Sequence, residues 1–112
     1  MQYMLLIYSN ENGEAEGDEQ DILRRYGAFT EDVRSNGKLV TADRLKPTAD
    51  ATTVRIRNGE TLVTDGPFAE TKEQLGGYYV LECENIDEAL AYAAQIPAAE
   101  QGSIEVRPVW EM

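Results

Sequence analysis

Apolar residues gather in two short runs of this chain, at residues 3–8 and 78–83. Neither run alternates clearly between apolar and polar positions, which is typical of strands that are covered on both faces. We therefore expect both runs to be central strands of one sheet. Residues 39–45 form a third strand candidate, and Lys46-Pro47 ends it because proline has no amide hydrogen for a strand ladder.

Two further segments have the periodicity of helices. The first carries an apolar stripe at helical spacing, formed by Ile22, Tyr26, Phe29 and Val33. Asp18 is its expected N-cap, and Asn36-Gly37 supplies the glycine that commonly ends a helix. The second helix has an expected buried stripe of Ile86, Leu90, Ala93 and Ala94.

The start of the second helix has the pattern of a capping box, with Asn85 as the cap and Glu88 at the third helical position. Pro97 ends this helix. Between the two helical segments, Asn58-Gly59 separates two β-rich runs, at residues 52–57 and 60–64, and this dipeptide is a strong signal for a hairpin. Residues 103–110 alternate and form the last strand.

The element order is strand, helix, strand, hairpin, strand, helix, strand. This is the split βαβ pattern of a ferredoxin-like α+β fold, with an antiparallel sheet, two helices on one face and an inserted hairpin. A single domain over residues 1–112 accounts for the whole chain. Two helices leave the other face of the sheet uncovered, so we expect a homodimer with sheet-to-sheet packing.

The charge and composition of the chain argue against some classes of binding partner. The net charge is −11, from 10 basic and 21 acidic residues, and the basic residues are scattered, which argues against direct binding to nucleic acid. No apolar run approaches the roughly 18 residues of a membrane span. The first residues lack the basic region of a signal peptide, and Cys83 is the only cysteine, so we expect a cytoplasmic protein without a membrane partner.

The segment from Asp65 to Glu82 is the most promising place for function, because it joins a tight turn and a charged loop to an apolar strand. Our candidate catalytic residues are Asp65, Tyr78 and Arg107. For each there is a structural alternative: Asp65 caps the turn that follows it, Tyr78 packs at a dimer interface, and Arg107 pairs with Glu105 or Glu82 across the sheet.

Glu70, Lys72 and Arg44 are candidate ligand-binding residues. Arg44, near the end of the second strand, can clamp an anion with two hydrogen bonds. The alternative for Glu70 and Lys72 is a solvated surface position, as for most charged residues. Histidine is absent, and no cysteine cluster or calcium-loop spacing occurs, so we expect neither a metal nor another cofactor.

The chain resembles the DGPF-domain proteins of the YCII-related family along nearly its whole length. The signature is Asp65-Gly66-Pro67-Phe68, continued by residues 69–78, and residues 4–8, 26–29 and 105–109 also look typical. The resemblance implies a dimeric α/β barrel of ferredoxin-like protomers. It implies little about activity: members are mostly small bacterial proteins without an established function, some encoded beside or fused to sigma factors.

Three hypotheses about function follow. The first is a regulatory or binding module that acts through a protein partner, such as a sigma factor or another transcription regulator. The second is a small-molecule enzyme of the dimeric barrel type that uses carboxylate and tyrosine chemistry; the His-Asp pair proposed for the YCII branch has no counterpart in a chain without histidine. The third is a structural dimer without a ligand.

Overall fold

The computed structural model describes residues 1–12 and 19–111, and the expected N-cap Asp18 lies outside them. The elements are β1 (Gln2–Ser9), α1 (Glu19–Ser35), β2 (Leu39–Arg44), the short 3-10 helix η1 (Thr48–Asp50), β3 (Thr52–Arg57), β4 (Glu60–Asp65), β5 (Gln74–Glu82), α2 (Ile86–Ala93), η2 (Pro97–Glu100) and β6 (Ser103–Pro108). No helix among the described residues is long and apolar enough to cross a membrane.

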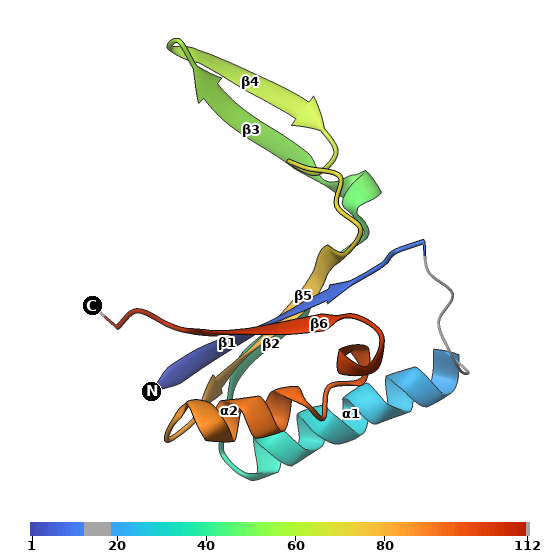
Figure 1. Ribbon diagram of the computed structural model, residues 1–112, viewed down its shortest axis with the longest axis vertical. Helices are drawn as coiled ribbons and strands as arrows, with labels where there is room; N and C mark the ends of the chain where they lie inside the picture. The colour runs from blue at the N-terminus through green and yellow to red at the C-terminus, as the bar shows by residue number, and fades with distance from the viewer. Residues whose placement is uncertain (13–18, 112) are drawn as a thin grey trace.

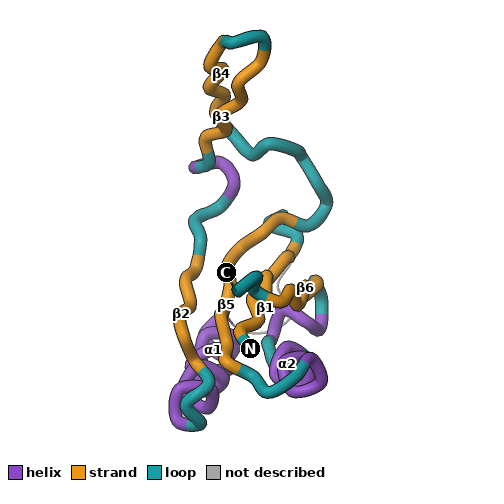
Figure 2. The backbone as a smooth tube through the Cα atoms, turned by 90° about the vertical axis from the view of Figure 1, so that its left-hand side faces the viewer, coloured by secondary structure: helices purple, strands orange, loops and turns teal. Residues whose placement is uncertain are grey.

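The main sheet has four antiparallel strands in the order β2-β5-β1-β6. Figure 1 shows both helices on one face of this sheet, and Figure 2 shows the four strands side by side above them. The predicted ferredoxin-like α+β fold is confirmed, with β1 and β5 at the centre. Their register pairs Leu5 with Tyr79 and Leu6 with Tyr78.

Within the single chain, β1 is fully buried on one of the two faces that we expect to be covered. Tyr3, Leu5 and Ile7 face the helices and are buried, whereas Met4 and Leu6 on the opposite face are half-buried. Although its residues are almost all apolar, β1 alternates between buried and half-buried side chains, as strands of a sheet that is covered on one face usually do. The helix-facing side belongs to the core, and the opposite side is apolar without a covering element from its own chain.

The core joins α1 to the helix-facing side of the sheet. Phe29 meets Tyr79 edge to face, with ring centroids 5.0 Å apart, and the Tyr79 hydroxyl lies 2.7 Å from the Thr30 hydroxyl. Val33 is completely buried, as its position in the predicted stripe requires. Gly37 follows the helix with φ 70°, which confirms the predicted glycine stop.

The predicted buried stripe of α2 is largely wrong. Ala89 and Ala93 are the buried residues of this helix, while Ile86 and Leu90 are exposed. Small alanine side chains let the helix approach the sheet closely, so the larger side chains are turned outward. The capping box itself is confirmed at its cap, because the Asn85 side chain accepts a hydrogen bond of 3.0 Å from the backbone amide of Glu88.

Strands β3 and β4 form a separate two-stranded sheet, which we call the arm (residues 52–65). Its turn is the predicted Asn58-Gly59, where both residues have positive φ, 52° and 79°, as a tight hairpin turn of this type needs. The arm stands away from the body on the side opposite the helices (Figures 1 and 2). The radius of gyration is consequently 15.9 Å, against roughly 13 Å for a compact domain of this length.

Candidate functional site

We call the side of the main sheet that points away from the helices the outer face. It has an apolar centre and a polar rim on both edges. The strand registers place these residues on it: Thr41 and Asp43 of β2, Tyr78 and Val80 of β5, Met4, Leu6 and Tyr8 of β1, and Glu105 and Arg107 of β6. The outer face is therefore amphipathic in the way that interfaces often are, apolar within and polar around.

On the β2 edge, Tyr78 and Asp43 form a hydrogen-bonded pair. The Tyr78 hydroxyl donates to Oδ2 of Asp43 over 2.9 Å. This hydrogen bond to Asp43, helped by the negative charge of the carboxylate, raises the pKa of Tyr78 above its ordinary value of 10.0. Tyr78 is thus a neutral hydrogen-bond donor near neutral pH, already occupied by a carboxylate of its own chain.

On the β6 edge, Arg107 pairs with Glu105, which also accepts a hydrogen bond of 3.5 Å from the Tyr8 hydroxyl. The hydrogen bond to Glu105 raises the pKa of Arg107 above its ordinary value. Glu105 is one of the partners considered for Arg107 from the sequence. The other, Glu82, instead holds the amino group of Met1 at 2.8 Å.

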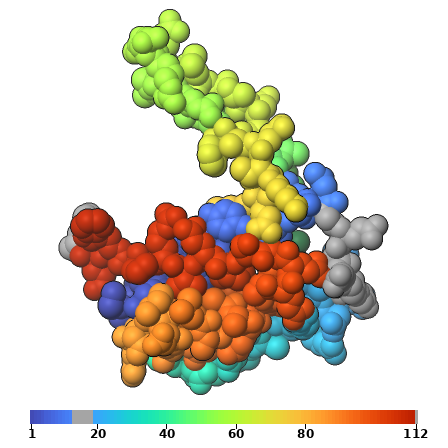
Figure 3. Space-filling view, viewed as in Figure 1, coloured from blue at the N-terminus to red at the C-terminus, as the bar shows by residue number. Residues whose placement is uncertain are grey.

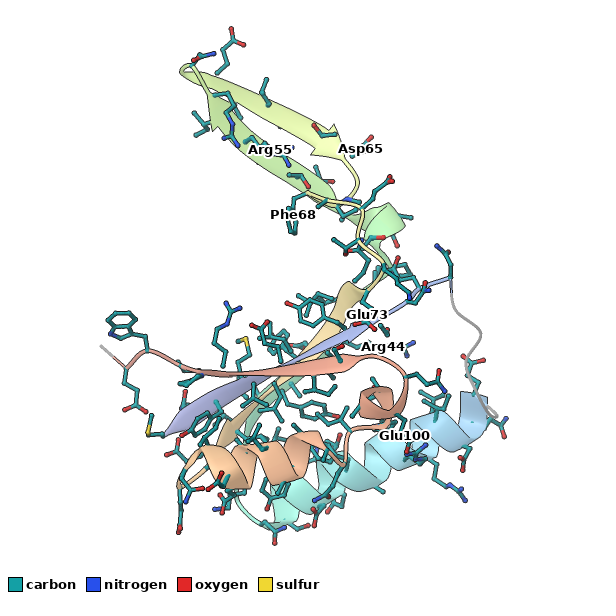
Figure 4. All side chains as sticks on the ribbon, viewed as in Figure 1. Arg44, Arg55, Asp65, Phe68, Glu73 and Glu100 are labelled. Carbon is teal, nitrogen blue, oxygen red and sulfur yellow. The ribbon has the colours of Figure 1, made fainter. Side chains whose placement is uncertain are left out.

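Arg44 lies away from this face. In the register Arg44 pairs with Gly77, whose neighbour on β1 is the core residue Ile7, so its side chain belongs to the helix-facing side. Its positive charge acts on the hydroxyl of Tyr26, although burial dominates and raises the pKa of that tyrosine. Figure 4 shows Arg44 far below the labelled Asp65.

The Asp65-Gly66-Pro67-Phe68 signature closes the base of the arm. The Gly66 amide donates to Ala51 O over 2.7 Å, and the Thr53 hydroxyl donates to Gly66 O over 2.8 Å. A guanidinium nitrogen of Arg55 donates to Phe68 O over 2.9 Å. The turn is thus tied to β3 by its main chain, and no hydrogen bond of the Asp65 carboxylate is found among the described residues.

The loop after the signature brings Glu73 to the main sheet. The Ser103 hydroxyl donates to Oε1 of Glu73 over 2.8 Å, which links the base of the arm to the start of β6. Glu70 and Lys72 are exposed and form no hydrogen bond or ion pair with other described residues. The structure therefore brings Tyr78 and Arg107 onto one face, and leaves Asp65, Glu70 and Lys72 on the arm and its base.

Gly66 has φ 106°, a conformation that residues with a side chain adopt only at a cost of about 1–3 kcal/mol. We expect Gly66→Ala to loosen the base of the arm and to speed hydrogen exchange of the Thr53 and Arg55 amides. Gly76→Ala is the matched control, because a Cβ there meets no atom within 4 Å and its φ is not positive. Equal exchange rates in the two variants would contradict this role of Gly66.

The Tyr78–Asp43 pair predicts a pH dependence. A raised folded-state pKa of Tyr78 means that its contribution to stability is complete below pH 10.0, the unfolded value, and is lost as the pH rises through the folded value. Asp43→Ala removes both the hydrogen bond and the charge that raise it, so the pKa of Tyr78 should move back toward 10.0. NMR titration of the tyrosine ring carbons measures this, and Tyr26, whose pKa is raised mainly by burial, should keep its titration.

A recess among the described residues lies on the other side of the molecule. A groove of about 280 Å³ lies on the helical side, lined by Arg25, Ala28, Phe29, Asp32 and Gln95. The described residues contain no group of three or more metal-ligating side chains placed to hold an ion. The candidate residues Tyr78 and Arg107 lie instead on the outer face, and Asp65 lies on the arm.

Sequence reasoning missed Asp43 and Tyr8, which complete the rim of the outer face. The signal for Asp43 was present in the alternation of β2, but the bulge at Val40, where the register with β5 shifts, obscures it. Tyr8 was absorbed into an apolar run that was taken to be buried. Both residues are identified only when the register between strands is known.

A four-stranded antiparallel sheet with two helices on one face defines this chain as a ferredoxin-like α+β protein. The model of the YCII-related domain matches residues 1–112. The chain is also 41% identical, over 97% of its length and 92% of the other, to an uncharacterised protein of Rhizobium meliloti (strain 1021). The chain therefore belongs to the YCII-related family.

Proposed function

We propose that this protein is a homodimeric binding module, whose outer face pairs with the outer face of a second copy. The observation that carries the proposal is that neither helix of the chain packs against this apolar face. Met4 and Leu6 lie at its centre and are half-buried, Val80 beside them is buried, and the polar side chains of the rim pair with one another. A second copy of the same sheet supplies a surface of matching shape and polarity.

The exposed surface of the single chain supports this proposal. It measures 7995 Å², whereas a compact 12.5 kDa monomer exposes roughly 6,200 Å². The excess, about 1,800 Å², is of the size that each subunit of a permanent dimer buries. Part of this surface lies on the arm, where Val54, Ile56, Leu62 and Val63 are exposed.

The arrangement of the polar side chains on the outer face favours a binding role over a catalytic one. Tyr78 is engaged by Asp43, and Arg107 by Glu105, so the candidate side chains satisfy one another across neighbouring strands. Asp65 lies apart from both pairs, on the arm. Pairs of this kind orient an interface and select its partner.

We propose further that the protein partner of the dimer is a transcription regulator such as a sigma factor. Support comes from the resemblance to DGPF-domain proteins encoded beside sigma factors. The net charge of −11 favours a basic, DNA-binding protein as partner over DNA itself. Each dimer would present two copies of its acidic surface to such a partner.

Calorimetric titration of the protein with a sigma factor or transcription regulator of the same organism tests the proposed partner. We expect binding at micromolar concentration that weakens as salt is raised, because the attraction is largely between opposite charges. No heat of binding at micromolar concentration and low salt would overturn the choice of partner and leave the dimer untouched.

A small-molecule enzyme is the second candidate, favoured by the position of the Tyr78–Asp43 pair beside the apolar Leu6 and Val80. When two outer faces meet, such a pair would line the interior of the barrel, and a phenol and a carboxylate can donate and accept protons there. A ligand screen by thermal shift tests it: a compound that stabilises the native protein but not Tyr78→Phe supports an enzyme or ligand site.

A further inference from the structure

The arm has one apolar face that its own chain leaves open. In its register Val54 lies opposite Val63, and Ile56 follows Val54 on the same face. Val54 is 60% exposed, Ile56 is 66% exposed and Val63 is 64% exposed. A two-stranded hairpin by itself is marginally stable in water, so a folded arm with this face exposed needs a surface to cover it.

The arm and the chain termini lie at opposite ends of the main sheet. β1 ends and β5 begins where the arm departs, as the pairing of Ser9 with Gln74 shows, whereas Gln2 pairs with Glu82 at the other end. Trp110 lies at that other end, in the segment after β6, and is 88% exposed. Figure 3 shows the arm standing clear of the surface formed by the C-terminal part of the chain.

In the proposed dimer, two copies pack with their outer faces together. If the two-fold axis between them is perpendicular to the strands, the arm end of one sheet lies next to the terminal end of the other. The arm of each copy then stands beside the terminal end of the other copy. Its strands of six residues are about 20 Å long, twice the roughly 10 Å between packed sheets. The arm is therefore long enough to pass the partner's sheet and to reach its terminal segment.

We propose that the two copies clasp each other through their arms, with Val54, Ile56 and Val63 of one copy covering Trp110 of the other. This inference rests on the proposed dimer and specifies how its copies contact each other. The apolar face of the arm and the indole of Trp110 are both large apolar surfaces that the single chain leaves exposed. Contact between them removes both from water.

The area that needs a cover supports a second copy as the occupant. The single chain exposes about 1,800 Å² more than a compact monomer of its mass, and the exposed apolar side chains of the arm hold part of this excess. The face formed by Val54, Ile56 and Val63 carries no charge from Val54 to the tip, because the charged pair Arg57 and Glu60 lies on the other face of the arm. It therefore matches an apolar surface such as Trp110, and one association of two copies covers both.

Trp110 is the only tryptophan, so its fluorescence reports on the clasp directly. We expect the acrylamide quenching constant of the native dimer to be about half that of a monomeric variant, Leu6→Glu, or less, because residues within an interface are largely excluded from solvent. The double variant Val54→Ser/Val63→Ser should show quenching as strong as the monomer. Leu62→Ser, on the other face of the same arm, is the matched control and should quench like the native protein.

Mass measured on the same samples by light scattering separates the clasp from the dimer. A native dimer in which Trp110 is quenched as strongly as in Leu6→Glu overturns the clasp while the dimer stands. A native dimer with a protected Trp110 that the double arm variant leaves protected also overturns it. A native monomer overturns the clasp together with the proposed function. Loss of both protection and dimer in the arm variant, but not in Leu62→Ser, supports the clasp.

Discussion

Replacing Leu6 with glutamate is expected to convert the dimer into a monomer without unfolding the chain. Leu6 lies at the centre of the outer face, between Tyr78 and Glu105 in the register. An unpaired carboxylate buried in an interface costs about 3–5 kcal/mol, and the two-fold axis places one in each copy. The dissociation constant should rise by at least about a thousandfold.

Leu23→Glu is the matched control for this prediction. Leu23 is an exposed leucine of α1, on the helical side of the molecule, and the same change of charge there should leave the dimer intact. Light scattering at a series of concentrations measures both variants. A Leu6→Glu variant that remains as dimeric as Leu23→Glu would show that the outer face is not the interface.

Gly102→Ala is expected to be the most destabilising small substitution in the body of the protein. A Cβ at Gly102 would lie 2.1 Å from Tyr8 O and 3.2 Å from Ala98 O, and backbone atoms cannot rotate away as side chains can. Overpacking of this kind costs about 3 kcal/mol or more, so the melting temperature should fall by roughly 10–20 °C at equal protein concentration. Calorimetry or thermal denaturation followed by circular dichroism measures it.

Gly27→Ala is a control that is expected to raise the melting temperature instead of lowering it. Gly27 is exposed within α1, and a Cβ there meets nothing within 4 Å. Alanine in the interior of a helix is more stable than glycine by about 0.5–1 kcal/mol, so this variant should melt slightly above the native protein. Similar melting temperatures for the two glycine variants would contradict the close packing of β1 against the start of β6.

The fold could be predicted from sequence where local chemistry decides the conformation. Asn58-Gly59 sets a hairpin because both residues adopt positive φ, and Asn85 caps α2 through a hydrogen bond that spans three residues. These interactions are formed by neighbours in the chain. The order of such elements was then sufficient to indicate the ferredoxin-like arrangement.

The faces of the elements were harder to predict, because burial depends on what lies across from them. Leu90 was assigned to the core, but Ala89 occupies it, since the spacing of apolar residues in α2 allows more than one buried stripe. Met4 and Leu6 were assigned a cover that the single chain does not provide. The sequence indicates that this face is apolar, and the structure shows both helices of the chain on the opposite face of the sheet.

The candidate site was predictable only in part. Tyr78 and Arg107 do share the outer face, but they were chosen without Asp43, the residue that determines the pKa of Tyr78. The signature around Gly66 suggested chemistry, while its described contacts tie the arm to β3. Pairings such as Tyr78 with Asp43 join residues 35 positions apart, which no local pattern reveals.

The proposed homodimer would give these features a common explanation. It would cover the apolar outer face, supply a surface for the arm and place Trp110 within reach of a second copy. The polar pairs of the rim then border the interface, where their charges favour one orientation of the two sheets. Each of these consequences depends on the association of two chains.

Sedimentation equilibrium of the native protein at micromolar concentration is therefore the most direct test. The proposed pairing of outer faces predicts a mass twice that of the 12.5 kDa chain, maintained over at least a tenfold dilution. A mass of 12.5 kDa at these concentrations would contradict the homodimer and, with it, the function proposed for the outer face.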